Sequence, residues 1–346
     1  MSLKRLLHIA LAIAIIIALT GCSALDMMVG LKNNDEKLKV YDELAIIDDE
    51  EDISEEAIET ITINQDTANL SNITAYYKDA NGFIVPVITG IPWEEGIAKA
   101  TVRKMVIGSD KEKELSQSGL HGVLPEGTQI LGMSIKDGVC VVDFTKNILN
   151  SASYEDERDM MTALTYTLTE FDTVDKVEIM VEGQELETLA KGYPVNVAFE
   201  RENINLVGSE DGANYTVYYK TPETEVAGYY VPITFSAEAV GNPVKIVLEK
   251  LFNGPPSDLP VQNDIPYGVS LNNVSLSQGI AKLDLSMAAL NLSQKEYEDL
   301  NKIVVLCLKQ FEDVDDIAFS IEGISFEEAG LNLTDTEVTP VFNNFQ

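Results

Sequence analysis

Residues 169–183, "TEFDTVDKVEIMVEG", recur with changes as residues 309–323, "KQFEDVDDIAFSIEG". Both stretches have phenylalanine at the third position and end in Glu-Gly, at Gly183 and Gly323. In each, the end of an apolar helical pattern leads into a short alternating pattern that is typical of a strand. A chain that repeats a helix-to-strand junction in this way is predicted to contain one structural unit twice.

The repetition extends in both directions, and the two copies show the same order of strand and helix patterns. The predicted elements of the first copy are 73–79, 83–89, 98–108, 129–145, 160–171 and 176–183, and those of the second are 215–221, 229–235, 242–256, 270–286, 293–311 and 316–323. Each copy is therefore predicted to be an α+β domain of order β-β-α-β-β-α-β, with a small mixed sheet and two helices packed on it.

Local signals support these elements. Pro243 is placed to begin a helix, and Ser293 followed by Glu296 predicts a capping box at the start of another. Each hairpin has glycine as the second residue of its turn, at Gly138 and Gly279, which favours a tight two-residue connection. The helices and hairpins are thus expected from short-range patterns alone.

Pro86 and Pro232 occupy the same place inside the second strand of their copies. Because proline cannot donate a hydrogen bond to a strand ladder, both strands are predicted to lie at sheet edges. The two prolines therefore mark a possible edge-strand interface for a partner.

The polar stretch "VGSEDGAN" (207–214) separates the copies and is typical of a domain boundary. We expect one domain over residues 66–206 and another over residues 213–346. Because each contains a full set of strands and two amphipathic helices, each is predicted to fold on its own.

The N-terminus indicates export and attachment to a membrane. Lys4 and Arg5 precede the apolar run "LLHIALAIAIIIALT", which is too short to span comfortably and is typical of a signal peptide. It ends in "LTGC", which resembles the bacterial lipobox and implies cleavage after residue 21 and lipidation of Cys22. Several acyl chains on one residue hold a protein stably at a membrane surface. An uncleaved signal anchor with a coincidental cysteine is the alternative.

Residues 22–65 are polar and include "IIDDEEDISEE". A run of like charges repels itself and does not bury, so this segment is predicted to be an acidic linker between the anchor and the fold. Calcium binding is the alternative, but the run lacks the alternating ligands and the turn glycine of a calcium loop.

The charge balance restricts the partners. The chain has 24 Lys+Arg against 57 Asp+Glu, a formal net charge of -33. Such a chain repels phosphate backbones, so nucleic-acid binding is not expected, whereas a basic partner is allowed.

Cysteine and histidine are scarce. Once Cys22 is lipidated only Cys140 and Cys307 remain, and since neither recurs in the other copy both are predicted to be small buried side chains. His121 is the only histidine after the signal peptide. We therefore expect no cofactor, no His-based metal site and no Ser-His-Asp arrangement repeated in both copies.

The ordered motifs resemble a known family. They are "YYVPIT", "LFNGPP", "LPEGT" with "IPYG", "DGVCVVDFT" with "QGIAKLDLS", the opening stretch, and the bridge "ENINLV". Together, over about residues 70–340, they are similar to tandem GerMN domains, and a lipobox before two such domains resembles the GerM-like sporulation and germination lipoproteins of endospore-forming Firmicutes. The first copy departs in having "IGSD" where the family usually has Gly-Pro.

The resemblance implies a non-enzymatic role. GerM-like lipoproteins help to assemble the envelope complex that links mother cell and forespore, and GerMN domains are similar to the ring-building modules of secretion and sporulation machines. The implied location is extracytoplasmic, on the mother-cell membrane facing the forespore, and the implied partners are proteins of that complex.

An envelope glycan hydrolase is one alternative, and its only candidate groups are acids. Asp143 and Asp284 recur at the same place, and paired carboxylates can act as general acid and base on a glycan. However, each closes a strand just before polar turn residues, where a carboxylate caps backbone N–H groups. Glu182 and Glu322 are likewise expected in turns, so no catalytic residue is predicted.

A ligand-binding lipoprotein is the other alternative. Such proteins usually have two large lobes and clustered aromatic residues, whereas Trp93 is the only tryptophan here. The tyrosine pairs are predicted to lie in strands with one ring in the core and one outside it; they are Tyr76-Tyr77, Tyr218-Tyr219 and Tyr229-Tyr230.

Overall fold

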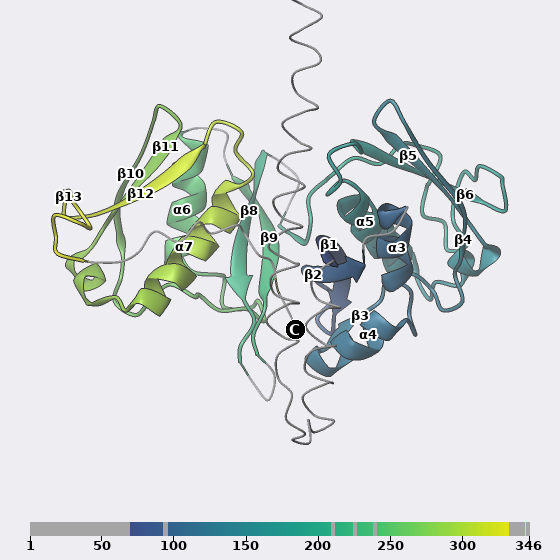
Figure 1. Cartoon of the computed structure of the whole chain (residues 1–346), viewed down its shortest axis with the longest axis horizontal. Helices are drawn as coiled ribbons and strands as arrows, with labels where there is room; N and C mark the ends of the chain where they lie inside the picture. The colour runs from purple at the N-terminus through teal and green to yellow at the C-terminus, as the bar shows by residue number, and fades with distance from the viewer. Residues whose placement is uncertain are drawn as a thin grey trace, which may run out of the picture. The chain divides into compact units, whose positions relative to one another are not determined.

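A computed structural model describes residues 70–92, 96–208, 212–223, 227–237, 241–331 and 343 (Figure 1). The chain from Ala68 to Gln346 forms one compact unit that includes both copies. Cys22, the signal peptide, the acidic linker and Trp93 lie outside the described residues, so the predictions made for them stay predictions.

The first copy follows the predicted order with short additions. Its elements are β1 (Leu70–Asp79), β2 (Ile84–Pro92), α3 (Ile97–Lys104), α4 (Asp110–Leu115), β3 (Leu120–His121), β4 (Ile130–Lys136), β5 (Val139–Phe144), α5 (Tyr154–Leu168) and β6 (Lys176–Val181). The departure from the family pattern at "IGSD" forms the start of α4, where the Ser109 side chain accepts a hydrogen bond from the Glu112 N–H at 3.1 Å.

The second copy repeats this order. Its elements are β7 (Leu206–Val207), β8 (Ala213–Lys220), β9 (Tyr230–Ala237), α6 (Pro243–Asn253), β10 (Leu271–Ser277), β11 (Ile280–Leu285), α7 (Gln294–Leu308), β12 (Asp316–Ile321) and β13 (Ile324–Ser325). Helix α6 begins at Pro243, and α7 begins with the predicted capping box of Ser293 and Glu296.

The strands of each copy form two small sheets. The orders are β2-β1-β3 and β4-β5-β6 in the first copy, and β7-β9-β8 and β10-β11-β12-β13 in the second. The sheets of β5 and β11 are mixed, because each of these strands has an antiparallel neighbour from its hairpin and a parallel neighbour after the second helix. The α+β fold class predicted for both copies is confirmed.

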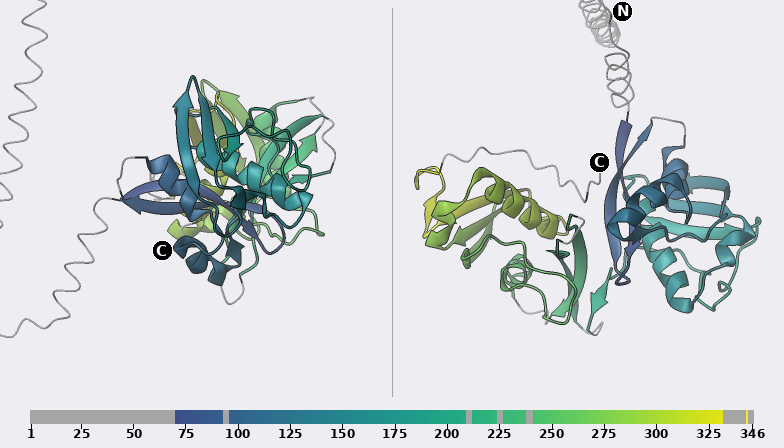
Figure 2. Two further views of the ribbon diagram at one scale, coloured as in Figure 1. Left: turned by 90° about the vertical axis from the view of Figure 1, so that its right-hand side faces the viewer. Right: turned by 90° about the horizontal axis from the view of Figure 1, so that it is seen from below.

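Helices separate the two sheets of each copy. Figure 1 shows α3 and α5 between the sheets of the first copy and α6 and α7 between those of the second, and the right-hand view in Figure 2 shows the same layers. Helix α5 contacts both β1 and β6, and α6 contacts both β8 and β10. A helix layer with apolar residues on two sides can cover two sheets, and this explains why the strands do not join into one.

The predicted hairpin turns are present. The turn residues Asp137 and Gly138 have φ of 51° and 80°, and Gln278 and Gly279 have φ of 53° and 76°. Two successive residues with positive φ form the type I′ turn that matches strand twist. Glycine meets this requirement at the second position without steric cost.

The prediction for the tyrosine pairs was wrong in two cases. Tyr76 and Tyr77 are both buried, as are Tyr229 and Tyr230. Alternation along a strand places one ring on each sheet face, so both rings are buried only where both faces are covered. In β1, the Tyr77 hydroxyl donates to the Lys104 carbonyl at 3.4 Å. The Tyr76 ring lies 5.1 Å from that of Tyr166, and its hydroxyl donates to Glu170 Oε1 at 3.1 Å.

Candidate interaction site at the junction of the two copies

The recurring aspartates bond to turns, as predicted. The Gly183 N–H donates to Asp143 Oδ1 at 2.9 Å, and the Gly323 N–H donates to Asp284 Oδ1 at 2.7 Å. The Gly323 N–H is the main cause of the lowered pKa of Asp284. These carboxylates therefore join the last strand of each copy to its hairpin.

Other predicted residues also lie in structural positions. Glu182 and Glu322 have φ of 52° and 49° in the turns after β6 and β12. Cys140 and Cys307 are buried free thiols, and burial raises their pKa values to about 11 and about 12. His121 Nδ1 lies 3.1 Å from a carboxylate oxygen of Glu112 on the surface of the first copy.

Metal-binding clusters and membrane-spanning helices are both absent from the described ranges. Within those ranges, no group of three or more His, Cys, Asp or Glu side chains is arranged to hold a metal ion. Of the helices that the structure describes, none is both long and apolar enough to cross a bilayer.

The copies are joined by two asparagines that make equivalent bonds. Asn205 accepts from the Ile84 N–H at 2.8 Å and donates through Nδ2 to the carbonyls of Ile84, at 2.8 Å, and Pro232, at 2.7 Å. Asn343 accepts from the Tyr230 N–H at 2.6 Å and donates to the carbonyl of Tyr230 at 2.8 Å. It also donates to the Pro86 carbonyl at 2.8 Å.

These bonds are reciprocal because Ile84 and Tyr230 are equivalent positions, as are Pro86 and Pro232. Each asparagine holds the N–H and C=O of one residue in its own copy and the proline carbonyl of the other copy. We call Asn205 and Asn343 the crossed asparagines. Each follows the last strand of its copy and reaches the second strand of the other.

Backbone hydrogen bonds also link each crossed asparagine to the second strand of the other copy. The Asn205 carbonyl accepts from the Thr234 N–H at 3.3 Å, and the Asn343 carbonyl accepts from the Ile88 N–H at 2.9 Å. Strand β7 then runs parallel to β9, and Asn343 forms a parallel bridge with Val87. Strand β2, which contains Pro86, lies at the edge of its sheet as predicted, whereas β9, which contains Pro232, lies between β7 and β8, so the edge prediction was wrong for Pro232. The chain itself thus pairs with both strands, through Asn343 at β2 and through β7 at β9. An external partner at Pro86 or Pro232 stays a prediction, and it would have to displace a crossed asparagine.

Only part of this junction is signalled in the sequence. The motif "ENINLV" contains Asn205 and stands out as a bridge between the copies. Asn343 belongs to no periodic pattern and no motif of the sequence. Its structural role depends on contacts with residues more than a hundred positions earlier in the chain.

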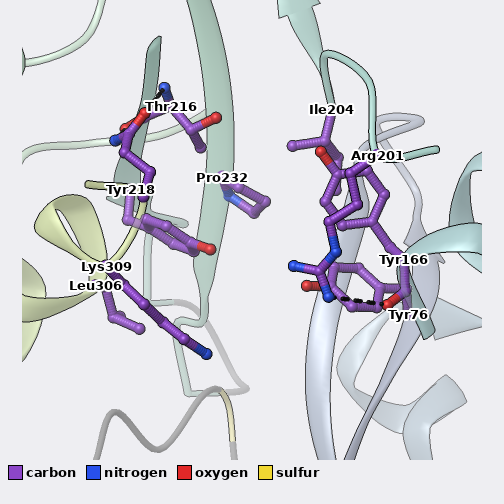
Figure 3. Close-up of a pocket in the computed structure, with 10 residues that line it drawn as sticks. Tyr76, Tyr166, Arg201, Ile204, Thr216, Tyr218, Pro232, Leu306 and Lys309 are labelled. Carbon is purple, nitrogen blue, oxygen red and sulfur yellow. Dashed lines mark hydrogen bonds between the residues drawn. The ribbon is translucent and has the colours of Figure 1, made fainter. Parts of the chain in front are cut away.

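A groove of about 250 Å³ lies at the same junction (Figure 3). The first copy contributes Tyr76, Tyr166, Arg201 and Ile204. The second contributes Thr216, Tyr218, Pro232, Leu306, Lys309 and Gln310. Figure 3 shows the polar ends of Tyr218 and Lys309 directed toward the side on which Arg201 and Tyr76 lie. We call this site the junction groove.

Several groups of the first copy hold Arg201 in the junction groove. Its Nε donates to Thr169 Oγ1 at 2.7 Å, and its Nη2 donates to the Tyr166 carbonyl and to Glu170 Oε1. The guanidinium also lies 5.0 Å from the centre of the Tyr166 ring, a cation–π contact. Burial is the main cause of the raised pKa of Tyr166, which is about 12, so its hydroxyl stays protonated.

Comparison with known proteins identifies the repeated unit. The Germane family model, described as sporulation and spore germination, matches residues 74–187 and 216–327, one match in each copy. The chain belongs to the Germane family. The two GerMN domains thus account for well over half of the 346 residues.

Two relatives are similar over both domains. The spore germination protein GerM of Bacillus subtilis (strain 168) is 28% identical over 281 residues, covering 77% of this chain and 76% of GerM. The solved structure of the tandem GerMN domains of the Bacillus subtilis sporulation protein GerM matches with a TM-score of 0.64 and 25% identity. The match covers 80% of this chain and 98% of the solved GerM chain. The tandem fold of this chain is therefore that of GerM.

Proposed function

We propose that this chain is a non-enzymatic, lipid-anchored envelope protein of sporulation that acts as an assembly factor for the mother cell–forespore channel complex. Membership of both copies in a family of sporulation and spore germination carries the proposal. The similarity to GerM over both domains supports the same process for the whole chain. The protein then acts in spore formation, and any effect on germination is an indirect result of a defect in spore formation.

The junction supports a scaffolding role. The crossed asparagines use six side-chain hydrogen bonds to join the second strands of the two domains. Two domains held in this way present two protein surfaces from one chain. When both surfaces bind, the second contact is intramolecular and gains effective concentration.

The recurring acids support the same conclusion. Asp143 and Asp284 each accept from a backbone N–H of their own domain, in turns that fix the last strand. A general acid or base needs to reach a substrate proton, whereas these carboxylates are already used within the fold.

The proposed location depends on Cys22. Lipidation of this residue places the GerMN domains outside the cytoplasm and on a membrane, with residues 22–65 as the linker. The proposed partners are envelope proteins of the sporulation complex.

The test is deletion of the gene in its own spore-forming host. Counts of heat-resistant spores should fall, and microscopy should show arrest after engulfment starts, when the two membranes face each other. The wild-type gene and the Asp143→Asn, Asp284→Asn double variant should both restore spores. Normal spore counts in the deletion strain would overturn the proposal, and a stable but inactive double variant would favour a hydrolase.

A further inference from the structure

We infer that a cavity in the first GerMN domain binds one neutral sugar ring, a hexopyranose. The cavity has a volume of about 420 Å³ and is lined by the turn between β1 and β2, by helix α5 and by the bridge "ENINLV". Its volume is within the range of small-molecule sites in proteins. We call it the polar cavity. Sugar binding goes beyond the proposed assembly role and does not depend on it.

Polar side chains from four separate segments line the polar cavity. They are Asn81, Arg158, Thr162, Tyr193, Glu202 and Asn203. The last four of these make no side-chain hydrogen bond to any residue that the structure describes. Together they offer both donors and acceptors, which suits sugar hydroxyls because each hydroxyl can donate and accept.

Asn81 and Arg158 are held in place and keep atoms for a ligand. Asn81 Nδ2 donates to Asp79 Oδ2 at 3.3 Å, and no described residue donates to Asn81 Oδ1. Arg158 donates to Asp159 Oδ1 through Nε, at 3.1 Å, and Nη2, at 2.9 Å, while its Nη1 has no acceptor among the described residues. A side chain that is already oriented loses little entropy when it binds a ligand.

The charges of the polar cavity favour a neutral ligand. Its charged lining residues are Arg158, Asp159 and Glu202. Asp159 is paired with Arg158 and with Lys78, whose Nζ lies 2.8 Å from Asp159 Oδ2. The unpaired carboxylate of Glu202 opposes an anion, and the Arg158 guanidinium opposes a cation.

The remaining lining groups suit the apolar face of a sugar ring. Phe83, Ile84 and Leu206 provide apolar surface beside the polar groups, and Tyr193 provides an aromatic ring. The Tyr193 ring is stacked on that of Phe199, with 6.1 Å between the ring centres. A ring held in this way can pack against the C–H groups on one face of a pyranose.

The second domain has the same scaffold without all of these polar groups. The crossed asparagines align its last segment with the bridge, so that Pro340 and Val341 stand in place of Glu202 and Asn203. The fold therefore does not require polar side chains at these two positions. Their presence in the first domain favours a role in binding.

The polar cavity is suited to binding a sugar and not to hydrolysing it. Glycosidases use two carboxyl groups, one on each side of the bond that is cleaved. Of the two carboxylates that line the polar cavity, Asp159 is held by Lys78 and Arg158, which leaves only Glu202. Binding without hydrolysis agrees with the non-enzymatic role proposed above.

The test uses the full chain in a detergent without a sugar head group. Methyl β-glucoside and methyl N-acetyl-β-glucosaminide are the pyranose probes, sorbitol is the open-chain match and methyl β-glucuronide is the anionic match. Saturation-transfer NMR titrations give the dissociation constants. At least one neutral glycoside should bind about tenfold more tightly than sorbitol, because a rigid ring loses less entropy and presents a flat C–H face. The neutral glycoside that binds more tightly shows whether an acetamido group is recognised.

Variants assign binding to the polar cavity. Thr162→Val and Asn203→Ala each remove hydrogen-bonding atoms and should weaken binding of that glycoside by about threefold to tenfold. Glu200→Ala is the matched control, because Glu200 precedes the bridge, does not line the polar cavity and pairs with Lys176. This control should bind the glycoside as the wild type does. Thermal melts confirm that each variant is folded, and either cavity variant gives an independent result if the other is not.

Three outcomes would overturn the inference: neutral glycosides that bind no more tightly than sorbitol, a glucuronide that binds more tightly than the glucoside, or unchanged binding by both cavity variants. None of them bears on spore counts in the deletion strain, so this test and that of the proposed function fail separately.

Discussion

At the scale of single residues, the fold depends on polar side chains that satisfy backbone groups. Glu157 is fully buried in α5 and accepts from the N–H groups of Lys191, at 2.7 Å, and Tyr193, at 3.1 Å. Asp143 and Asp284 do the same for the glycines after the last strands. The roles of the two aspartates were predictable from position and recurrence. The role of Glu157 was not, because its partners are more than thirty residues away and do not recur.

The substitutions Asp143→Asn and Asp284→Asn test the structural role of the two carboxylates. Each should lower the free energy of unfolding by about 0.5–2 kcal/mol, since an amide replaces a charged acceptor of a backbone N–H. Urea denaturation of each variant gives the value. Asp172→Asn is the control, because Asp172 is exposed in the turn after α5. A loss as large in the control would show that the effect is not due to these bonds.

The lowered pKa of Asp284 also predicts a pH dependence. A carboxyl whose folded pKa is below its unfolded value of about 3.9 stabilises the protein at pH above that value. This contribution is lost as pH falls through the lower folded pKa. The stability difference between wild type and Asp284→Asn should therefore be constant from pH 7 to about pH 5 and shrink below about pH 4. Melting temperatures across this range would show it, and a difference that grows in acid would contradict it.

At the scale of elements, the features that could be predicted are those that short-range physics determines. The start of α6 at Pro243, the capping box of α7 and the glycine turns of both hairpins all follow from neighbouring residues. The division of the strands into two sheets and the burial of Tyr76 depend on what covers each face, which no local pattern records. The junction groove was missed for the same reason, since its walls come from both domains.

The crossed asparagines can be tested at this scale. Asn205→Ala removes an acceptor from the Ile84 N–H and a donor from two carbonyls, so it should lower the free energy of unfolding by about 2–4 kcal/mol. Hydrogen exchange should rise at the amide of Ile84, which donates to the Asn205 side chain. Asn203→Ala is the matched control, two residues earlier and exposed. Equal exchange in the two variants would contradict a structural role for the Asn205 side chain.

At the scale of the whole molecule, we propose that a lipid anchor at Cys22 holds the pair of GerMN domains at a membrane. Cys22→Ala should leave the fold unchanged and either release the protein from membranes or leave its precursor uncleaved. Membrane fractionation and labelling with radioactive palmitate measure both effects. Equal palmitate incorporation by the variant would contradict lipidation at this residue.

Function is proposed to require both domains on one tether. One crossed asparagine lies within residues 66–206 and the other within residues 213–346, so each half keeps its own bond to Ile84 or Tyr230. Each half is therefore expected to melt cooperatively when expressed alone, and a broad, non-cooperative melt would contradict two separate domains.

The most direct measurement is the count of heat-resistant spores in a deletion strain that carries either lipidated half or the full chain. All three proteins have the same signal peptide, Cys22 and linker, and immunoblots of membrane fractions confirm equal amounts. The full chain should restore spores and neither half should. Full restoration by one half would contradict the requirement for both domains.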